Sequence, residues 1–392
     1  MSPNKKALAQ VTLKSICGGV GDFLKCIPMK KTPLHKKHLE LGARMGEFGG
    51  WDMPIQYAGI LQEHEHTRSK VSVFDICHMG EFELIGPSAC EDLEKLLTCD
   101  VASLKVGQVR YGFMLNEEGG TIDDLTCYRL EEERYMLVVN AGTIEKDAAW
   151  IRVQLSEATL FSDLSDSLAK LDVQGPKAAD ALNDVLNGRL PALGYFRFAE
   201  VETEEFSCLI SRTGYTGELG YEVYLPVAAV ESFWDQLLAH PMVEPAGLGA
   251  RDTLRLEMGY SLYGHELSEA DTPVSTSRGM FINSEKEFIG KAPVLAALEK
   301  PERYLVGLKF DSKRAARAHD KVFYAGEEVG EISSGSLAPS LDVAVAMAFV
   351  KPTLAKVGQM LEVEIRGKLF PAEVVALPFY KEGSARRTTN LH

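Results

Sequence analysis

Two adjacent carboxylates, Asp123 and Asp124, stand in the segment TIDDLTCYRL, whose other residues are typical of a β-strand. Aspartate is disfavoured in strands, so this pair is a candidate for chemistry. A carboxylate in a cleft can take up a proton or stabilise positive charge that develops during a reaction. Because successive side chains of a strand point to opposite faces, a single cleft can use only one of the two. The alternation predicts one face with Ile122, Asp124, Thr126 and Tyr128, and another with Asp123, Leu125 and Cys127.

Two further segments contain residues that could contact a ligand. The segment SRTGYTGELGYE, residues 211–222, is rich in glycine, which permits close approach of the backbone to a ligand. A glycine-rich hairpin without a ligand explains the same pattern. In GLGARDTLRLEMG, we expect Arg251 to follow a Gly-Ala turn and to precede a helix. Its guanidinium could bind a substrate carboxylate through two parallel hydrogen bonds, or it could pair with Asp252 or Glu257.

The one metal-like feature is EHEH at residues 63–66. His64 and His66 are two residues apart and therefore do not share a helical face, so even with His78 nearby in sequence we predict no metal site. The sequence contains no GxxxxGK[ST] loop, no GxGxxG after a strand, no HExxH and no GxSxG. The commonest nucleotide, zinc-protease and serine-hydrolase motifs are therefore absent.

The charge and cysteine content of the chain limit the kinds of molecule that it can bind. The chain has 392 residues, with 56 acidic and 42 basic side chains and a net charge of -14, which opposes nonspecific binding to nucleic acid or to an anionic membrane. No apolar run approaches the roughly 20 residues of a spanning helix. The seven cysteines form no CxxC pair, which favours a reducing, cytoplasmic compartment. We expect small molecules or proteins as partners.

Hydrophobic periodicity predicts the elements that must position these residues. Helices are expected over residues 34–46, 58–70 and 88–98, and the segments RYGFML, TIDDLTCYRL and YMLVVN are expected to form an antiparallel meander. FSCLIS and GYEVYLP are expected to form a hairpin, followed by a helix at VESFWDQLL. After about residue 302, short strands with frequent turns predict a small all-β barrel. The fold class is therefore α+β.

Taken together, the motifs resemble those of the T-protein family, the aminomethyltransferases of the glycine cleavage system. The resemblance runs from Thr32 to about Arg387. It rests on TPLHKKHLELGARMGEFGGWDMP, VFDICHMGEFELIGP, YGFMLNEEGGTIDDLTCYR, VVNAGTIEKDAAWI, LDVQGPKA, SRTGYTGELGYEV, PAGLGARDTLRLEMGYSLYGHEL, FIGK and GEISSGSLAPSL.

The resemblance implies a fold and a reaction. A folate-binding region of two intertwined lobes, residues 29–300, would be followed by a C-terminal antiparallel β-barrel, residues 301–392, in a three-lobed arrangement around a central folate site. The enzyme would transfer the methylene carbon of aminomethyl-dihydrolipoyl H-protein to tetrahydrofolate, its co-substrate, with release of ammonia. The lipoylated H-protein would be its protein partner. The expected location is the cytoplasm, or the mitochondrial matrix if the first 28 residues are a transit peptide.

The resemblance also implies site residues. The functional carboxylate of the family's GGxxDDL motif is the second of the pair, here Asp124, which makes Asp123 a turn, capping or supporting group. Glu222 would bind the pteridine ring, because a carboxylate can accept two parallel N–H bonds from such a heterocycle. The remaining residues implied to bind folate are Met79, Tyr111, Tyr128, Asn140, Tyr215, Arg251 and, less directly, Arg387, for which a solvated terminal arginine is an alternative.

One segment departs from the family pattern. TPVSTSRGMFIN places Ser275, Ser277 and Arg278 where the family usually has an acid, a glycine and a leucine. Cys77 stands where serine is usual. Two alternatives follow: a related folate-dependent demethylase acting on a small methyl donor, and a non-catalytic folate-binding protein. The second is disfavoured, because FIGKAPV lacks the cysteine of the KGCYxGQ motif that identifies such relatives.

Residues 1–28 carry four lysines, one aspartate and no arginine, whereas transit peptides are usually rich in arginine and poor in acids. This composition favours an extension ahead of a second start at Met29. We therefore expect deletion of residues 1–28 to leave both folding and activity intact. Thermal denaturation and an activity assay of the truncated protein check this, and a lower melting temperature would contradict it.

Overall fold

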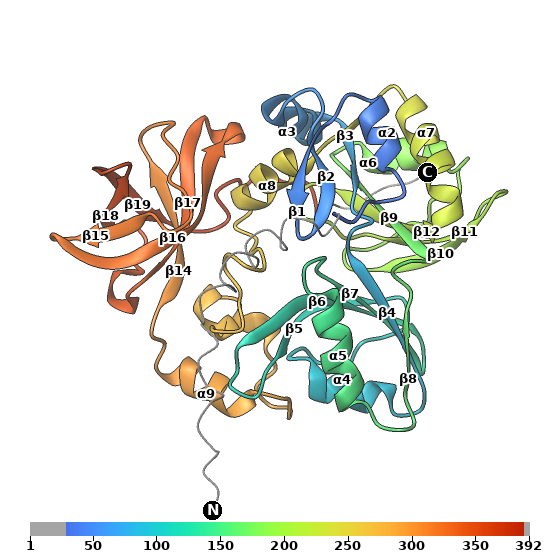
Figure 1. The fold of residues 1–392 in the computed structure, drawn as a ribbon, viewed down its shortest axis with the longest axis horizontal. Coiled ribbons are helices and arrows are strands. Elements are labelled where there is room, and N and C mark those ends of the chain that lie inside the picture. Colours follow the sequence, from blue (N-terminus) through green and yellow to red (C-terminus); the bar gives the residue numbers. More distant parts are fainter. Residues whose placement is uncertain (1–28, 388–392) are drawn as a thin grey trace, which may run out of the picture.

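The computed structural model describes residues 29–387, so the extension over residues 1–28 lies outside the described residues. Three lobes surround a common centre (Figure 1). The first lobe contains a six-stranded sheet, the second a five-stranded sheet, and the third is a closed six-stranded barrel. Among the described residues no helix is long and apolar enough to span a membrane.

The first lobe is a sheet of six strands whose neighbours are antiparallel except for the last pair. In spatial order the strands are β10 (Phe198–Glu202), β11 (Ser207–Ser211), β12 (Gly220–Pro226), β9 (Leu168–Gln174), β3 (Val71–Asp75) and β13 (Val243–Pro245). Helices α6 (Ala178–Val185) and α7 (Val230–Ala239) place apolar residues in the core of this lobe, which includes Leu182 and Trp234. The sheet face that packs against these two helices carries mainly apolar side chains, because the helices shield it from water.

The second lobe is an antiparallel sheet of five strands covered by two helices. Its strands are β5 (Val109–Leu115), β6 (Thr121–Glu131), β7 (Arg134–Val139), β4 (Gly80–Ile85) and β8 (Leu160–Asp163), and its helices are α4 (Ala89–Leu96) and α5 (Ile144–Gln154). The meander expected for β5, β6 and β7 is present. The two lobes are intertwined, because β3 and β4 are consecutive in the chain but belong to different sheets, as do β8 and β9.

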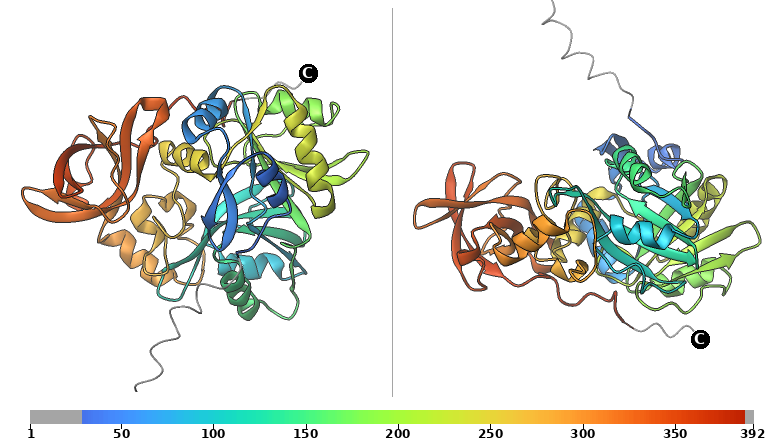
Figure 2. Two further views of the ribbon diagram at one scale, coloured as in Figure 1. Left: turned by 45° about the horizontal axis from the view of Figure 1, so that its top comes forward. Right: turned by 90° about the horizontal axis from the view of Figure 1, so that it is seen from below.

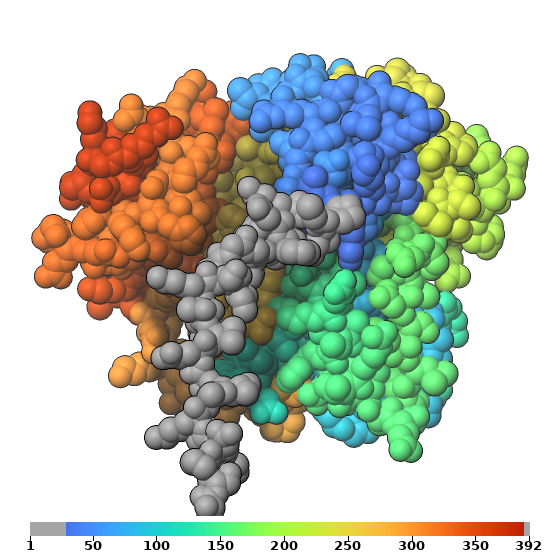
Figure 3. All heavy atoms as spheres, viewed as in Figure 1, coloured from blue at the N-terminus to red at the C-terminus, as the bar shows by residue number. Residues whose placement is uncertain are grey.

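The third lobe is the barrel that the turn spacing predicted. Its strands close in the order β14 (Tyr304–Phe310), β17 (Val343–Val350), β16 (Glu327–Ala338), β15 (Lys321–Tyr324), β18 (Met360–Ile365) and β19 (Lys368–Val375). Closure leaves no free sheet edge. The barrel projects to one side of the two sheets in two further views (Figure 2). The surface view shows residues of α8 (Leu248–Glu257) and the chain after it between the barrel and the other lobes (Figure 3).

Two expectations about helices were wrong. The predicted helix over residues 34–46 ends early: α2 spans His35–Glu40 and a hairpin of β1 (Arg44–Phe48) and β2 (Trp51–Gln56) follows. Gly42, with φ of 72°, adopts the left-handed conformation that terminates helices. Arg251 does not follow a turn but lies inside α8, which begins at Leu248.

The glycine in the first turn of α8 has a packing role. A Cβ added to Gly249 would lie 2.6 Å from the side chain of Ile60 in α3 (Ile60–Ser69) and 3.0 Å from the carbonyl oxygen of Ile55 in β2. Glycine therefore lets α8 approach α3 and β2 closely. This contact brings Arg251 to the centre of the molecule.

A buried ionic cluster connects α8 to the other lobes. Glu257, fully buried at the end of α8, accepts hydrogen bonds from Arg68 (2.9 Å) and from the backbone N–H of Ser340 (2.8 Å), which lies in the turn between β16 and β17 of the barrel. His64 lies 3.2 Å from the same carboxylate. Burial opposes the charge of Glu257, but His64 and Arg68 hold its pKa below the usual range. His64, one of the histidines considered for a metal, thus serves this junction.

We expect Glu257→Gln to lower the free energy of unfolding by about 3 kcal/mol, because the mutation leaves the buried Arg68 guanidinium only partly compensated. Urea denaturation measures the change. Glu244→Gln is the matched control, since Glu244 is exposed and pairs with His66 at 3.4 Å, and such a pair contributes between about 0 and 1 kcal/mol. Equal effects of the two mutations would contradict the assignment of Glu257 to the junction.

Candidate active site

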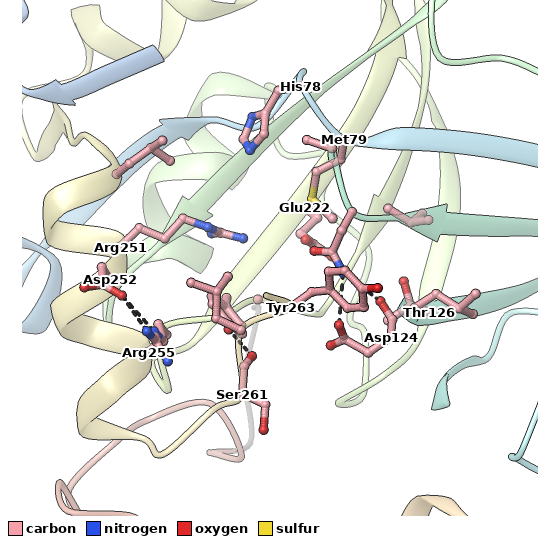
Figure 4. Close-up of a pocket in the computed structure, with 18 of the residues that line it drawn as sticks. His78, Met79, Asp124, Thr126, Glu222, Arg251, Asp252, Arg255, Ser261 and Tyr263 are labelled. Carbon is pink, nitrogen blue, oxygen red and sulfur yellow. Dashed lines mark hydrogen bonds and ion pairs between the residues drawn. The ribbon is translucent and has the colours of Figure 1, made fainter. Parts of the chain in front are cut away.

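A cavity of about 430 Å³ lies where the two sheets and α8 meet, a volume within the usual range for small-molecule sites. Seven of the residues selected from the sequence line it: Met79, Tyr111, Asp124, Asn140, Tyr215, Glu222 and Arg251. In the close-up, Arg251 reaches from α8 into the central space, with Asp124 and Thr126 on the other side and Glu222 and Met79 between them (Figure 4). Side chains from four separate parts of the chain therefore converge here.

Asp124 is held by two donors at one side of the cavity. Its carboxylate accepts hydrogen bonds from the Tyr111 hydroxyl (2.8 Å) and from Nδ2 of Asn140 (3.0 Å). Tyr111 of β5 is paired with Thr126 of β6, which is two residues from Asp124. The side chains of Tyr111 and Asp124 therefore lie on the same face of the sheet. The Tyr111 ring is fixed by edge contacts with Phe113 and Phe281, at centroid distances of 5.3 and 4.7 Å. This arrangement keeps the carboxylate directed into the cavity.

Asp123 is on the opposite face of β6 and does not line the cavity. Its fully buried carboxylate accepts hydrogen bonds from the backbone N–H (2.9 Å) and from Nδ2 (2.8 Å) of Asn140. The predicted alternation fails at one residue, because Ile122 packs in the same core as Leu125 and Cys127. The register shifts between Met114 and Leu115, so that Ile122 is the extra residue of a bulge, and a bulge reverses the alternation.

The two neighbouring carboxylates change the acidity of Asp124. Burial and the charge of Asp123 raise the pKa of Asp124 to about 7, although Tyr111 and Asn140 partly oppose the shift. At neutral pH Asp124 therefore exists in both the acid and the carboxylate form. Such a group can both accept and return a proton during one reaction cycle.

The end of the cavity near Glu222 contains a buried ion pair. Lys170 Nζ lies 2.9 Å from Glu222 Oε1, and the Thr213 hydroxyl donates to Oε2. Burial opposes the charge of Glu222, but Lys170 and Thr213 hold its pKa below the usual range. Glu222 is thus a carboxylate, and its remaining lone pairs can accept N–H groups of a ligand.

Arg251 pairs with a residue that sequence analysis did not consider. Its Nη1 donates to Asp172 of β9 (2.6 Å), rather than to Asp252 or Glu257. Its guanidinium lies 5.0 Å from the centre of the Tyr215 ring. Burial raises the pKa of Asp172 to about 6, although Arg251 opposes the shift. The remaining guanidinium N–H groups of Arg251 can bind an anionic or carbonyl group of a ligand.

His78 and Met79 line a third wall. Buried His78 contacts Phe48 edge to face at 5.6 Å, and its Nδ1 has no hydrogen-bond partner among residues 29–387. Burial lowers the pKa of His78 to about 4, so the imidazole is neutral. Met79 Sδ lies 3.6 Å from Lys170 Nζ. No group of His, Cys, Asp and Glu side chains suited to a metal occurs in this range.

Two predicted site residues lie outside the cavity wall. Tyr128 is fully buried beneath it, and its hydroxyl is 2.8 Å from that of Tyr224 and 3.4 Å from Glu222 Oε2. Tyr128 therefore contacts Glu222 and does not line the cavity. Arg387 is exposed, and its carbonyl oxygen accepts a hydrogen bond from Arg212.

The segment that departs from the family pattern lies beside the cavity without lining it. Arg278 donates to the carbonyl oxygen of Gly259, and its guanidinium is 6.0 Å from the centre of the Tyr260 ring. The Ser275 hydroxyl donates to the carbonyl oxygen of Thr272. These substitutions thus have local structural partners.

The glycine-rich segment has a packing role and a lining role. A Cβ on Gly214 or Gly220 would lie within 2.3 Å of the Gln174 side chain, so glycine is required for β9 and this segment to approach each other. Thr213, Gly214 and Tyr215 also line the cavity. The segment is therefore both a tightly packed glycine-rich connection and part of the cavity wall.

Sequence analysis missed Lys170, Asp172 and His78. Lys170 and Asp172 are two residues apart in LAKLDVQ and therefore lie on the same face of the strand. Two charged residues at this spacing in an otherwise apolar strand indicate that this face meets other polar groups. Their partners, Glu222 and Arg251, come from distant segments, which no local pattern can identify. His78 had been considered only as a metal ligand.

Comparisons with known proteins agree with this architecture. The sequence matches the family described as GCVT N-terminal domain over residues 34–286 and that described as Glycine cleavage T-protein C-terminal barrel domain over residues 303–381. Curated relatives named aminomethyltransferase include one from Moorella thermoacetica, 44% identical over 90% of this chain and 98% of the relative, and one from Thermotoga maritima, 42% identical over 92% and 100%. A crystal structure of the glycine cleavage system aminomethyltransferase T from Bartonella henselae is 37% identical, with a TM-score of 0.87, over 91% of this chain and 99% of that one.

The raised pKa of Asp124 predicts a pH-dependent effect on stability. Between about pH 4 and 7 the folded protein holds a proton on this carboxyl that the unfolded chain has released, so the carboxyl makes the folded state less stable as the pH rises. We expect Asp124→Asn to raise the free energy of unfolding by about 2 kcal/mol at pH 8 and by less at pH 5.

Urea denaturation at the two pH values measures this effect. The exposed Asp166→Asn serves as control and should change little at either pH. An Asp124→Asn protein whose stability difference is the same at both pH values would show that the carboxyl has an ordinary pKa.

Proposed function

Because the chain belongs to the glycine cleavage T-protein family, we propose that its central cavity transfers a one-carbon unit from aminomethyl-dihydrolipoyl H-protein to tetrahydrofolate. The chain is an aminomethyltransferase of the glycine cleavage system. The proposal concerns the two substrates, the roles of the side chains, and the identity of the carboxylate that acts. The observation that supports it most is a single cavity with a carboxylate of shifted acidity on one wall and an ion-paired carboxylate and an arginine on the others.

The residues present fit a reduced pteridine with a charged tail. Glu222 is a carboxylate that is already anchored by Lys170, and its free lone pairs suit the adjacent N–H groups of a 2-amino-4-oxo ring. Arg251 bonds Asp172, the cross-strand neighbour of Glu222, and its unused N–H groups suit a carbonyl or carboxylate of the ligand. Tyr111 and Tyr215 supply aromatic surface in the wall of the same cavity.

When bound, tetrahydrofolate supplies the two nitrogens that receive the carbon, and the balance of the transfer requires proton movement. Both nitrogens lose a proton, ammonia leaves the donor carbon, and the sulfur of the lipoyl arm recovers a proton as a thiol. In our proposal Asp124 accepts a proton from a folate nitrogen and returns it to a leaving group. A pKa of about 7 suits both steps, since each form is populated at neutral pH.

The neighbours of Asp124 keep it effective. Tyr111 and Asn140 hold the carboxylate in one orientation, which lowers the entropic cost of proton transfer. In its ionised form the carboxylate also stabilises positive charge on the carbon that is being transferred. Neutral His78, on another wall, adds no positive charge that would oppose this stabilisation.

The partner and the location are part of the proposal. The family implies the lipoylated H-protein as donor, and the two-lobed cavity must admit a lipoyl arm together with folate. We propose a cytoplasmic reaction, consistent with cysteines that are free in the described chain and with the bacterial origin of the relatives named above.

A transfer assay tests the proposed substrates. Purified protein with tetrahydrofolate and aminomethyl-loaded H-protein should release ammonia and form methylenetetrahydrofolate in equal amounts. Failure with H-protein, together with turnover of a small methyl donor, would instead support the demethylase alternative.

We expect Asp124→Asn to reduce turnover by about 100-fold or more, because the amide cannot transfer a proton. The affinity for tetrahydrofolate, measured by isothermal titration calorimetry, should change by less than about threefold, since Asp124 is not assigned to hold the ring. Asp166→Asn is the control. Turnover of the Asp124→Asn protein near the wild-type value would refute the assignment of this carboxylate.

A further inference from the structure

A third buried aspartate lies next to the Asp123–Asp124 pair. Asp147, in the first turns of α5, is fully buried, and neither of its carboxyl oxygens accepts a hydrogen bond from any described residue. Its polar neighbours are Asp123 and Thr143. An ionised carboxylate in such a position would be both unsolvated and adjacent to another anion, which is a costly arrangement.

The side-chain donors of Thr143, Asn140 and Lys146 are used on other groups. The Thr143 hydroxyl donates to the carbonyl oxygen of Asn140 (2.9 Å), and the Asn140 amide donates to Asp123 and Asp124. Lys146, the adjacent cation, uses its three N–H groups on Ile122 O (2.9 Å), the Tyr263 hydroxyl (2.8 Å) and Glu269 (2.7 Å). Neither carboxyl oxygen of Asp147 accepts a hydrogen bond from these groups.

We infer that Asp147 is protonated at neutral pH and donates this proton to Asp123, so that the two form an acid–carboxylate pair beneath the cavity. Burial and the charge of Asp123 raise the pKa of Asp147 to about 10, in agreement with the donor count. The charged and titratable groups that face the pair from the surrounding elements are Asp124 of β6, Tyr111 of β5, Lys146 of α5, and Tyr263 and Glu269 after α8.

The pair positions Asp124 through Asn140. Asp123 accepts two hydrogen bonds from Asn140, and the proton of Asp147 supplies a third, so that Asp123 remains an anion. Asp123 thereby fixes the Asn140 amide, whose Nδ2 also donates to Asp124 at 3.0 Å. Because Nδ2 is used on this side, the Oδ1 atom of Asn140 is left as an acceptor at the cavity wall. The charge of Asp123 in turn raises the pKa of Asp124. Asp147 is thus a positioning residue that does not touch the cavity itself.

Infrared spectroscopy tests the protonation state directly. At pH 8, protein carrying ¹³C-labelled aspartate carboxyls should show the C=O band of a protonated carboxylic acid. The band should be much weaker in Asp147→Asn and unchanged in the Asp166→Asn control. Identical spectra for Asp147→Asn and the wild type would overturn the inference.

The titration of Asp124, followed by ¹³C NMR without substrate, tests the positioning role. Asn is neutral and can still donate to Asp123, so Asp147→Asn should leave the midpoint of Asp124 unchanged. Asp147→Ala removes the donor, so that Asp123 takes up a proton and the midpoint of Asp124 falls by about one pH unit. A downward shift in Asp147→Asn equal to that in Asp147→Ala would show that Asp147 is ionised in the wild type and would overturn the inference.

The consequence for catalysis rests on the proposed function, whereas the protonation of Asp147 does not. Both measurements are made on the free protein. A protein that fails the transfer assay but gives the expected infrared and NMR results would refute the function alone. Absence of the acid band in an active protein would refute the acid–carboxylate pair alone.

Discussion

The cavity exists because charged side chains of one helix are buried where three lobes meet. From α8, Arg251 pairs with Asp172 of the first lobe, and Glu257 pairs with Arg68 of α3. Between them Arg255 bonds Glu266 (3.2 Å) and Ser334 of the barrel (2.9 Å). Buried ion pairs add little net stability, because desolvation offsets most of their attraction. However, any arrangement of the lobes that separates one of these pairs leaves a buried charge without a partner and is therefore unstable. The pairs thus specify how the lobes sit around the cavity.

The same principle divides the cavity electrostatically. Near Glu222, the cation Lys170 balances the carboxylate, which therefore stays ionised. Near Asp124, burial and the charge of Asp123 raise the pKa values of Asp124 and Asp147. One end is thus suited to bind fixed N–H groups, and the other to exchange protons. The uncompensated end costs stability, which is common where a site is built for chemistry rather than for packing.

The barrel contributes to this arrangement without lining the cavity. It contacts α8 through Ser334 and the residues around Ser340, which bond Arg255 and Glu257. These bonds fix the position of the helix that presents Arg251 and Arg255 to the cavity. A change in the barrel can therefore alter the cavity through α8, although no barrel strand reaches it.

The sequence by itself determined the fold class, the meander that carries Asp124, the barrel, and seven of the cavity residues. These features follow from local patterns: period-two alternation, turn residues and contiguous motifs with a family resemblance. The bulge that turns Ile122 inward and the place of Arg251 inside α8 were decided by tertiary packing. So were the partners of Arg251 and Glu222 and the protonation of the buried acids. The energy of a buried charge depends on which distant groups surround it, and only the folded chain brings those groups within a few ångströms of one another.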